Sequence, residues 1–432
     1  MGTRMTTDKN ALSRRIVRSP DMVIYTELNK TLSEEESSLK EQIHRFARDV
    51  LRPAALELDP LPPEDVIARG SVYWDVLRHY RQLGYHLRGM PEEFGGVTLS
   101  PLSQHIVGEE MGWGAADLSV SMGAGSMPFA FAARAGNKEL IEKYVQPYVG
   151  DIEGRFVGCW GVTEPQHGSD AVFMGNGNAP PGVGFDVFAE IERDEWIIRG
   201  QKSSWVSNGT IATHAMVHLG VDKTRGMPGS AIAFVPLDLP GVTKGKPLDK
   251  LGQRALNQGE IFFDEVRIPA SYVLVPEQGY TMMGDFILAG ANGGMGATFT
   301  GLARAAFEEG LTYARQRVQG GRAICEHQAV QLKLMDMFIK VEAARGLSRS
   351  AIVYNATTIP PAPEYSVASK VFCTQAAFEV ASDALQLHGG YGLAKGMVIE
   401  KLFRDARAAL IEDGTNDVLA LAGARRIIDR NN

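Results

Sequence analysis

The sequence has little cysteine and no excess of basic residues, and each absence excludes a class of protein. Its three cysteines, Cys159, Cys325 and Cys373, are scattered singly, so they form neither a metal-binding spacing nor a disulfide framework. A reducing environment fits this pattern best. The formal net charge is −7, and the chain has no basic tail or stripe. Nucleic acid is therefore not expected as a partner.

Long hydrophobic runs are also missing. No segment approaches the roughly 20 apolar residues that span a bilayer, so we expect no membrane span. The start of the chain is polar and basic without an apolar secretory core, and we interpret residues 1–31 as an N-terminal arm. An organelle-targeting segment is the alternative for this arm. The expected location is the cytoplasm in a bacterium, or the mitochondrial matrix in a eukaryote.

The composition changes twice along the chain. Residues 32–154 show helical periodicity, residues 155–276 contain short β-prone runs between glycine, proline and asparagine clusters, and residues 277–432 are helical again. We therefore predict an α+β fold with three domains: an N-terminal α-helical domain, a middle antiparallel β domain and a C-terminal α-helical domain. We find no GxGxxG or P-loop pattern, so a Rossmann domain is not predicted.

Local signals set some of the predicted helix ends. A capping box at Ser33–Glu36 predicts the start of the first helix, and Pro53 predicts its end. Gly389 and Gly390 are placed to terminate the third long C-terminal helix. The three long helices predicted there are Ala303–Arg317, Ala329–Tyr354 and Val367–Leu387.

Two segments of the middle domain have the character of binding turns. In Trp160–Asp170 (WGVTEPQHGSD), a strand end with Thr163 is followed by a turn with Gly168 and Ser169. Such a turn offers hydroxyls and backbone N–H groups to a ring edge or a pyrophosphate without side-chain clash. In Trp205–Gly209, an aromatic residue and a hydroxyl alternate before a turn. Taken alone, each segment is more simply an ordinary β-turn.

An acid, Asp413, stands in the gap between two predicted helices. Apolar residues at helical spacing predict a helix over Val398–Ile411, and Thr415 or Asn416 can cap a last helix. A carboxylate on such a junction can point into a cleft, where a proton-abstracting base is useful. The alternative is a structural role as a helix-junction cap.

Together with Gln386–Gly392 and the pair Arg404-Asp405, these segments resemble the acyl-CoA dehydrogenase family, and the likeness runs from about Leu32 to Ile428. The family's segments TEP-x-x-GSD, W-[IV]-[TS]-NG, Q-x-x-GG-x-G and RD occur here in the same order, before a C-terminal DGT where the family has EGT. The resemblance implies a C-terminal four-helix bundle, with FAD between the last two domains and reaching into a neighbouring subunit. It also implies a homo-oligomer (a tetramer rather than a dimer), an acyl-CoA substrate, a 2-enoyl-CoA product and an electron-transferring flavoprotein as electron acceptor.

The resemblance further implies which residues bind FAD. Val162 and Thr163 look like the contacts of the flavin pyrimidine edge, and Ser207 would place its hydroxyl near N5. Donors in such positions suit a flavin, because negative charge accumulates on its edge on reduction. The implied positions outside the neighbouring subunit are Trp160, Val162, Thr163, Gly168, Ser169, Trp205, Ser207 and, at the AMP half, Thr415. The implied positions from the neighbouring subunit are Arg317, Gln328, Gln386, Gly389 and Gly390.

Alignment on Gly414-Thr415 puts Asp413 where the family usually has glutamate, so Asp413 is the predicted catalytic base. It would remove the α-proton of an acyl thioester, and burial beside flavin and acyl chain should raise its pKa. Aspartate is one methylene shorter, roughly 1.5 Å of reach, and a misplacement near 1 Å can cost on the order of 10²-fold in rate. Glu412, in a slot often aromatic in the family, is the competing candidate. The stretch Leu288–Met295, where some members carry the base, has no carboxylate.

Other interpretations stay open. A nitroalkane-oxidase-like flavoprotein also uses an aspartate base, and Gly301–Glu309 and Glu326–Gln328 resemble that enzyme, whereas Gly389–Gly392 and Gly414-Thr415 look more dehydrogenase-like. A relative that binds flavin and nucleic acid is disfavoured by the negative net charge. An added loop at 175–184 is either a lip over the thioester entrance or a surface loop. No metal site is predicted.

Overall fold

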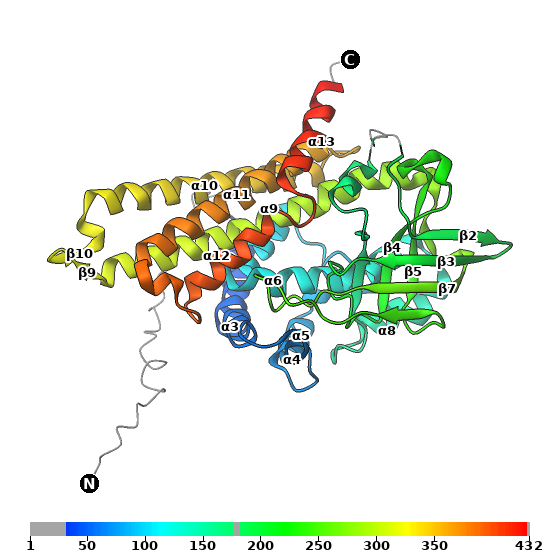
Figure 1. Ribbon diagram of the computed structural model, residues 1–432, viewed down its shortest axis with the longest axis horizontal. Helices are drawn as coiled ribbons and strands as arrows, with labels where there is room; N and C mark the ends of the chain where they lie inside the picture. Colours follow the sequence, from blue (N-terminus) through cyan, green and yellow to red (C-terminus); the bar gives the residue numbers. More distant parts are fainter. Residues whose placement is uncertain (1–31, 176–178, 180–181, 430–432) are drawn as a thin grey trace, which may run out of the picture.

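The computed structural model describes residues 32–175, 179 and 182–429. The predicted arm at 1–31 lies outside the described residues, as do part of the 175–184 loop and residues 430–432. In Figure 1, long helices form an upper layer, the N-terminal helices lie beneath it, and a β-sheet stands at one end. Among the described residues, no helix combines the length and the apolar character needed to cross a membrane.

The N-terminal domain is helical, as predicted. Its helices are α2 (Glu34–Phe46), α3 (Arg52–Leu58), α4 (Pro63–Val66), α5 (Val72–Gln82), α6 (Pro101–Ala135), α7 (Lys138–Leu140) and α8 (Gln146–Val149). The predicted capping box is confirmed, because Glu36 N donates to Ser33 Oγ at 3.1 Å and Ser33 N donates to Glu36 Oε2 at 2.9 Å. The prediction that Pro53 ends the first helix is wrong. A π-helical turn, η1 (Ala47–Leu51), joins α2 to α3, and Pro53 lies in the first turn of α3, where its missing N–H is tolerated.

The middle domain contains a sheet of order β6-β7-β3-β2-β4-β5-β8, with β1 paired to β4 beside this path. Its strands are β1 (Gly158–Gly161), β2 (Phe188–Glu192), β3 (Glu195–Lys202), β4 (His214–Gly220), β5 (Ser230–Pro236), β6 (Val242–Lys244), β7 (Ile261–Pro269) and β8 (Val273–Val275). The β1–β4 and β2–β4 pairs are parallel, so the prediction of an antiparallel domain is wrong for them. The chain passes through β2 and β3 before it returns as β4, and this long crossover lets β4 run parallel to β1.

The C-terminal domain is the expected helical bundle. Its elements are α9 (Glu277–Gln316), the hairpin β9 (Val318–Gln319) and β10 (Arg322–Ala323), α10 (Gln328–Ala356), α11 (Pro363–His388), α12 (Val398–Ala409) and α13 (Asn416–Asp429). Gly389, at φ +56°, ends α11 as predicted. The 40 residues of α9 make it about 60 Å long at 1.5 Å per residue. The prediction that the chain is helical again from residue 277 is confirmed, whereas the amphipathic segment Ala303–Arg317 covers only the last part of this helix.

Glycine explains this difference. The first half of α9 is rich in glycine, which disfavours a helix in isolation. A Cβ atom at Gly296 would lie 2.2 Å from Ser369 Oγ, and one at Gly301 would lie 1.9 Å from the backbone oxygen of Glu109. These glycines therefore let α11 and α6 approach α9 directly, and packing rather than propensity maintains the helix.

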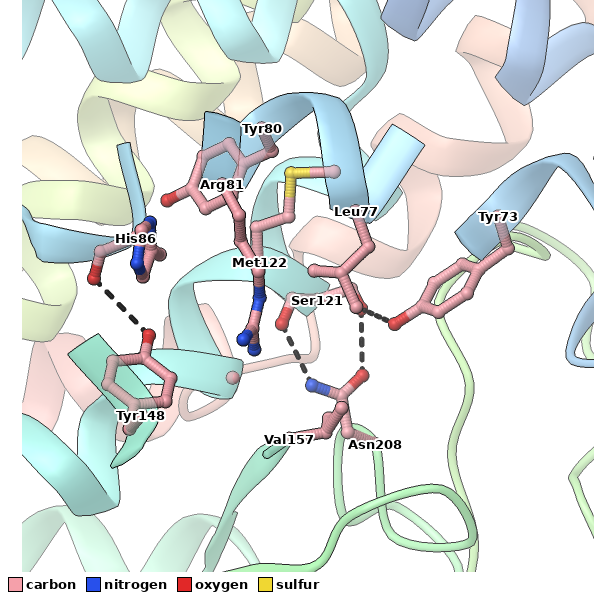
Figure 2. A pocket seen from close by; sticks show the side chains of 11 residues that line it. Tyr73, Leu77, Tyr80, Arg81, His86, Ser121, Met122, Tyr148, Val157 and Asn208 are labelled. Atoms are coloured by element: carbon pink, nitrogen blue, oxygen red, sulfur yellow. Dashed lines mark hydrogen bonds between the residues drawn. The ribbon is translucent and has the colours of Figure 1, made fainter. Parts of the chain in front are cut away.

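A small cavity of about 10 Å³ lies between α5, α6 and the start of the β domain (Figure 2). This volume holds about one water molecule, so the cavity is not a flavin or substrate site. Its wall contains a chain of hydrogen bonds: Tyr73 Oη and Ser121 Oγ are 2.8 Å apart, and Ser121 Oγ donates to Asn208 Oδ1 at 2.7 Å. The chain fixes Asn208, which directly follows the predicted flavin contact Ser207.

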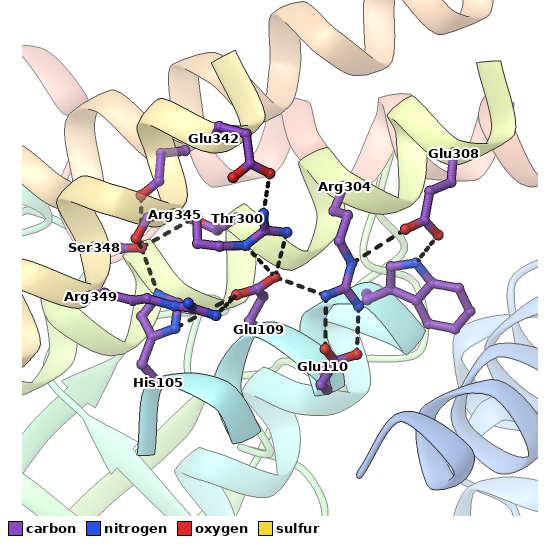
Figure 3. A network of polar contacts seen from close by, with 12 residues as sticks. His105, Glu109, Glu110, Thr300, Arg304, Glu308, Glu342, Arg345, Ser348 and Arg349 are labelled. Carbon is purple, nitrogen blue, oxygen red and sulfur yellow. Dashed lines mark hydrogen bonds and ion pairs between the residues drawn. The ribbon is translucent and has the colours of Figure 1, made fainter. Parts of the chain in front are cut away.

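A buried ionic network joins α6, α9 and α10 (Figure 3). Arg304 Nη1 donates to Glu109 Oε1 and to Glu110 Oε1, both at 2.8 Å. Arg345 Nε and Nη2 donate to Glu109 Oε1, both at 3.0 Å. Burial would raise the pKa of Glu110, but the charge and hydrogen bonds of Arg304 outweigh it and lower the pKa to about 2. The three helices are thus joined by ionised groups at neutral pH.

Candidate active site

The junction between α12 and α13 holds two consecutive residues in the left-handed conformation, Asp413 at φ +51° and Gly414 at φ +94°. Glycine is needed at the second position, because a Cβ atom there would lie 2.5 Å from Val172 Cγ1. An aspartate in this conformation costs of order 1–3 kcal/mol, and such residues cluster at active sites. The predicted base therefore lies on a strained turn.

The Asp413 side chain is exposed, and within the described part of the chain no group hydrogen-bonds to its carboxylate. Desolvation nevertheless raises the pKa of Asp413, and the positive charge of Lys370 opposes the rise. The residue therefore contacts solvent, while the surrounding protein still raises the pKa of its carboxyl. This combination suits a base whose partner is a ligand.

The adjacent acid, Glu412, is held differently. Its Oε1 accepts a hydrogen bond from Gln253 Nε2, and the residue is half-buried. Desolvation and the charge of Asp413 raise the pKa of Glu412 to about 7, while the Gln253 bond, Lys370 and Lys250 oppose the rise. Of the two neighbouring carboxyls, Asp413 is the one available to a ligand.

The first binding turn meets the Asp413 junction. Thr415 N donates to Ser169 Oγ at 3.0 Å across 246 positions of sequence. This bond places η5 (Ser169–Met174) against the turn between α12 and α13. Gly168 is exposed, and a Cβ atom there would meet nothing within 4 Å. The structure therefore brings the predicted residues Gly168, Ser169, Asp413 and Thr415 together.

Val162 and Thr163 follow β1 and lie beside the end of β3. The Thr163 backbone oxygen accepts from Ser203 N, and Thr163 Oγ1 accepts from Ser203 Oγ, both at 2.9 Å. Lys202 Nζ donates to Val162 O at 3.0 Å and pairs with Glu164 at 2.6 Å. Burial lowers the pKa of Lys202 to about 8, and Glu164 opposes this shift. These bonds give the predicted pyrimidine-edge contacts a rigid frame.

Trp205 presents an exposed aromatic face on a fixed backbone. The residue is 58% exposed, although its carbonyl accepts a hydrogen bond from Gln258 Nε2 at 3.0 Å. Ser207, half-buried, forms a β-bridge with the same Gln258. Asn208 is fully buried, and its Nδ2 donates to Ser121 O at 2.8 Å. A large aromatic ring held in solvent by such a loop fits a stacking role toward a flat ring such as a flavin.

Trp160 lies in the apolar wall of the same region. It is half-buried, and its Nε1 donates to His218 Nε2 at 2.8 Å. Together with Val162 it packs against a cluster that includes Val172 of η5, Leu288 of α9 and Leu419 of α13. The acid at the α12–α13 junction is therefore next to apolar surface, which an acyl chain requires.

The second set of predicted residues lies elsewhere. Arg317 lies at the C-terminal end of α9. Near the N-terminal end of α9, Gly284 packs on η5, since a Cβ atom there would lie 2.8 Å from the backbone of Met174. The separation of 33 positions in sequence corresponds to roughly 50 Å along the helix axis. The rings of Tyr313 and His388 stack at 4.1 Å, so the end of α11 is at the Arg317 end too. Five predicted residues are exposed at this far end: Arg317, Gln328, Gln386, Gly389 and Gly390.

Sequence reasoning missed Lys370 and Gln253. Lys370 Nζ donates to Gly414 O at 2.8 Å and to Asn416 Oδ1 at 2.9 Å, and it is fully buried. A signal for it exists, since Lys370 lies at helical spacing on the apolar face that carries Val367, and a buried lysine needs partners. Gln253 lies in an irregular segment with no comparable signal.

Three other side chains come close enough to suggest a metal site. One ligand atom each of Glu164, His167 and Asp186 lies within 4.8 Å of the others. Glu164, however, pairs with Lys202 and accepts hydrogen bonds from two backbone N–H groups. Its oxygens are therefore already used, and we assign no metal to this cluster.

The fold and this site define a three-domain flavin-dependent oxidoreductase. Family models describe the same three parts: acyl-CoA dehydrogenase N-terminal domain over residues 33–150, middle domain over 159–266 and C-terminal domain over 277–428. The chain belongs to the acyl-CoA dehydrogenase family, and its cofactor is FAD.

Individual relatives agree with this assignment. Cyclohexane-1-carbonyl-CoA dehydrogenase of Geobacter metallireducens is 32% identical, over 92% of this chain and 98% of the relative. The structure of butyryl-CoA dehydrogenase from Megasphaera elsdenii matches with TM-score 0.79 and 26% identity, covering 93% of this chain and 100% of that one. A chain from a structural study of the electron transferring flavoprotein of Acidaminococcus fermentans matches with TM-score 0.79 and 28% identity, covering 93% and 99%.

Proposed function

We propose that the protein dehydrogenates an acyl-CoA thioester to the trans-2-enoyl-CoA, with Asp413 as the base. The observation that carries this proposal is the free, desolvated carboxylate of Asp413, which lies on a left-handed turn beside Ser169 and Thr415. The acid has no hydrogen-bond partner among the described residues, whereas its neighbour Glu412 is bound to Gln253. A carboxylate with a raised pKa, no hydrogen-bond partner among the described residues and apolar side chains close by has the properties needed to take a proton from a carbon acid.

In this reaction the carboxylate of Asp413 receives the α-proton, and the electrons of that C–H bond form the new double bond. FAD, when bound, accepts the hydride that leaves the β-carbon. The raised pKa of Asp413 makes its carboxylate a stronger base, so transfer of the α-proton to it is less unfavourable. The Asp413 backbone N–H would hydrogen-bond to the thioester carbonyl and stabilise the developing enolate.

The proposed FAD contacts divide between two subunits. One subunit supplies Trp160, Val162, Thr163, Gly168, Ser169, Trp205, Ser207 and Thr415. A neighbouring subunit supplies Arg317, Gln328, Gln386, Gly389 and Gly390. The roughly 50 Å between the two sets along α9 supports this division, as does the exposure of the second set. We therefore propose a homo-oligomer, and a homotetramer in particular.

The substrate and the electron acceptor are proposed from the relatives. One of them acts on a ring-bearing thioester and another on butyryl-CoA, by their names, so both ring-bearing and short acyl-CoAs are candidate substrates. An electron-transferring flavoprotein is the proposed acceptor, supported by the match to a chain from a study of such a protein. The relatives favour this activity over nitroalkane oxidation.

Anaerobic mixing of the purified holoenzyme with a panel of acyl-CoAs tests the proposal. We expect butyryl-CoA or cyclohexane-1-carbonyl-CoA to bleach the oxidised flavin, and Asp413→Ala to abolish bleaching. Glu412→Ala should leave measurable bleaching. Bleaching by nitroethane with rapid reoxidation by oxygen, and no response to any acyl-CoA, would contradict the proposal. Loss of bleaching only on changing Glu412 would move the base to that residue.

A further inference from the structure

The turn that carries Asp413 needs support from its surroundings. Asp413 and Gly414 are both left-handed, and aspartate places its carboxylate one methylene closer to the backbone than glutamate does. A catalytic group must be held to within about 0.5 Å of its productive position. The Asp413 carboxylate makes no hydrogen bond to the described residues that would hold it in position, so the residues around the turn must hold the turn itself.

One anchor of the turn is Glu412. Its carboxylate accepts a hydrogen bond from Gln253 Nε2, and Gln253 is only 2% exposed. The Gln253 backbone N–H donates to Asp405 Oδ1, and Asp405 pairs with buried Lys401. Since Asp405 belongs to α12, the helix that ends just before Glu412, these contacts tie the turn to the helix that precedes it.

The other anchor is Lys370 of α11. Its Nζ donates to Gly414 O at 2.8 Å and to Asn416 Oδ1 at 2.9 Å. Asn416 Nδ2 in turn donates to Thr374 Oγ1 at 3.0 Å. The residues on both sides of Asp413 are therefore hydrogen-bonded to other elements. Gln253 holds Glu412 on one side, and Lys370 holds Gly414 and Asn416 on the other.

We propose that Glu412 and Lys370 are positioning residues that clamp the 412–416 turn from opposite sides and so aim the free carboxylate of Asp413 at the substrate. This inference rests on the proposed function and assigns a role to the acid next to the base. Glu412 supplies a hydrogen-bond anchor, and with a pKa of about 7 it adds a negative charge beside Asp413 only at higher pH. Lys370 supplies the second anchor and the opposing positive charge.

The charged groups around this pair come from α11 and from the segment between β6 and β7, and uncharged groups complete its surroundings. Lys370 faces both acids from α11. Lys250 faces Glu412 from the segment between β6 and β7, where its Nζ donates to Leu256 O at 2.7 Å and to Gln258 Oε1 at 2.8 Å. Gln253, from the same segment, offers Glu412 an uncharged donor. From η5, Ser169 bonds to the turn without charge. Asp413 therefore titrates with Lys370 as its charged neighbour, because Glu412, with a pKa of about 7, is protonated at lower pH.

Two variants separate the anchor from the charge. Glu412→Gln keeps an acceptor for Gln253 and removes the charge, whereas Glu412→Ala removes both. Stopped-flow flavin reduction by an acyl-CoA substrate should slow on the order of 10²-fold in Glu412→Ala, with the dissociation constant of the acyl-CoA nearly unchanged. Glu412→Gln should keep the rate within a few-fold and leave the acidic limb of the pH–rate profile in place. The reason is that Glu412, whose pKa is raised to about 7 beside the ionised Asp413, is already protonated where Asp413 titrates. Lys370→Met should move that limb to higher pH.

Crystal structures of the two Glu412 variants supply a readout that does not depend on catalysis. The 412–416 turn should leave the left-handed conformation in Glu412→Ala and keep it in Glu412→Gln. An unmoved turn in Glu412→Ala, or a rate loss in Glu412→Gln as large as in Glu412→Ala, would overturn the proposal. If no acyl-CoA reduces the wild-type flavin, the proposed function fails, and the clamp is still decided by the two structures. Flavin content and melting temperature identify a variant that has merely misfolded.

Discussion

Asp413 and Glu412 are adjacent carboxyls with different surroundings, and their titrations should differ accordingly. Desolvation raises the pKa of Asp413, so the proposed base loses its proton at a higher pH than an ordinary aspartate does. The rate of flavin reduction should therefore fall, as pH decreases, at a pH above 3.8, the ordinary value. Asp413→Asn should reduce the rate by about 10²–10⁴-fold at every pH. A wild-type rate that stays level down to pH 4 in rapid-mixing experiments would refute the assignment.

Glu412 gives a prediction for stability. Its pKa rises from 4.5 unfolded to about 7 folded, so the folded state binds this proton more tightly. The residue costs no stability below pH 4.5, and its destabilising effect grows as pH rises from 4.5 to about 7. Glu412→Gln should therefore raise the melting temperature at pH 8 and leave it nearly unchanged at pH 4.5. Calorimetry of the holoenzyme at both values measures this, and an equal shift at both would point to packing rather than charge.

The sequence located these acids, but not their partners. The Gly414-Thr415 pair places Asp413 in the chain, and the preceding helical periodicity indicates a junction there. Lys370 was missed although it interrupts an apolar helix face, because the pattern does not show which distant backbone oxygen will accept its hydrogen bonds. Gln253 was missed because its role depends on an irregular segment, which periodicity does not describe.

Among the elements, α9 shows how tertiary contacts override local propensity. Gly301 has no room for a side chain, because a Cβ atom would lie 1.9 Å from the Glu109 backbone oxygen. Gly290 lies in the same helix, and a Cβ atom there would meet nothing within 4 Å. The two glycines have equal propensity and different surroundings, so they form a matched pair for mutation.

We expect opposite effects from alanine at these two sites. Gly301→Ala must push α6 and α9 apart, so unfolding should become easier by about 1–3 kcal/mol, as for overpacked cores. Gly290→Ala should stabilise the protein by up to about 1 kcal/mol through helix propensity. Urea unfolding followed by far-UV circular dichroism gives both values. Equal destabilisation by the two substitutions would show that the α6–α9 contact is not the determining feature.

Element boundaries were predictable only where a local signal decides them. The capping box at Ser33 and the left-handed Gly389 are confirmed, because a single turn contains the whole cause. Pro53 does not end its helix, because it lies in the first turn of α3, where a proline is tolerated. The glycines in the first half of α9 disfavour a helix locally, but close packing against α6 and α11 requires them. The parallel pairing of β1 with β4 depends on a long crossover and has no local signal.

For the whole molecule, the separation of the two predicted FAD-binding sets leads to a complementation test. Arg317→Glu should lower FAD content although Arg317 lies roughly 50 Å along α9 from the Asp413 end. Asp413→Asn should bind FAD and be inactive. If sites are shared between subunits, unfolding and refolding the two variants together should restore activity, because a mixed oligomer contains sites with an intact residue of each kind.

Two controls accompany this test. Each variant refolded alone should stay inactive, and Arg78→Met, which alters an exposed ion pair with Asp75, should behave as wild type. If the mixed oligomers regained no activity and Arg317→Glu kept a normal FAD content, we would conclude that all cofactor contacts lie within one subunit.

The length of α9 has a consequence for how an assembly of this kind behaves. One end of α9 packs on η5 beside Asp413, the proposed base, and Arg317 at the other end is proposed to contact the flavin of the next subunit. Because α9 is one continuous helix, a thioester that displaced η5 at one end would also shift the end that carries Arg317. Occupancy of one catalytic centre would then be communicated to its neighbour as mechanical displacement along a single helix.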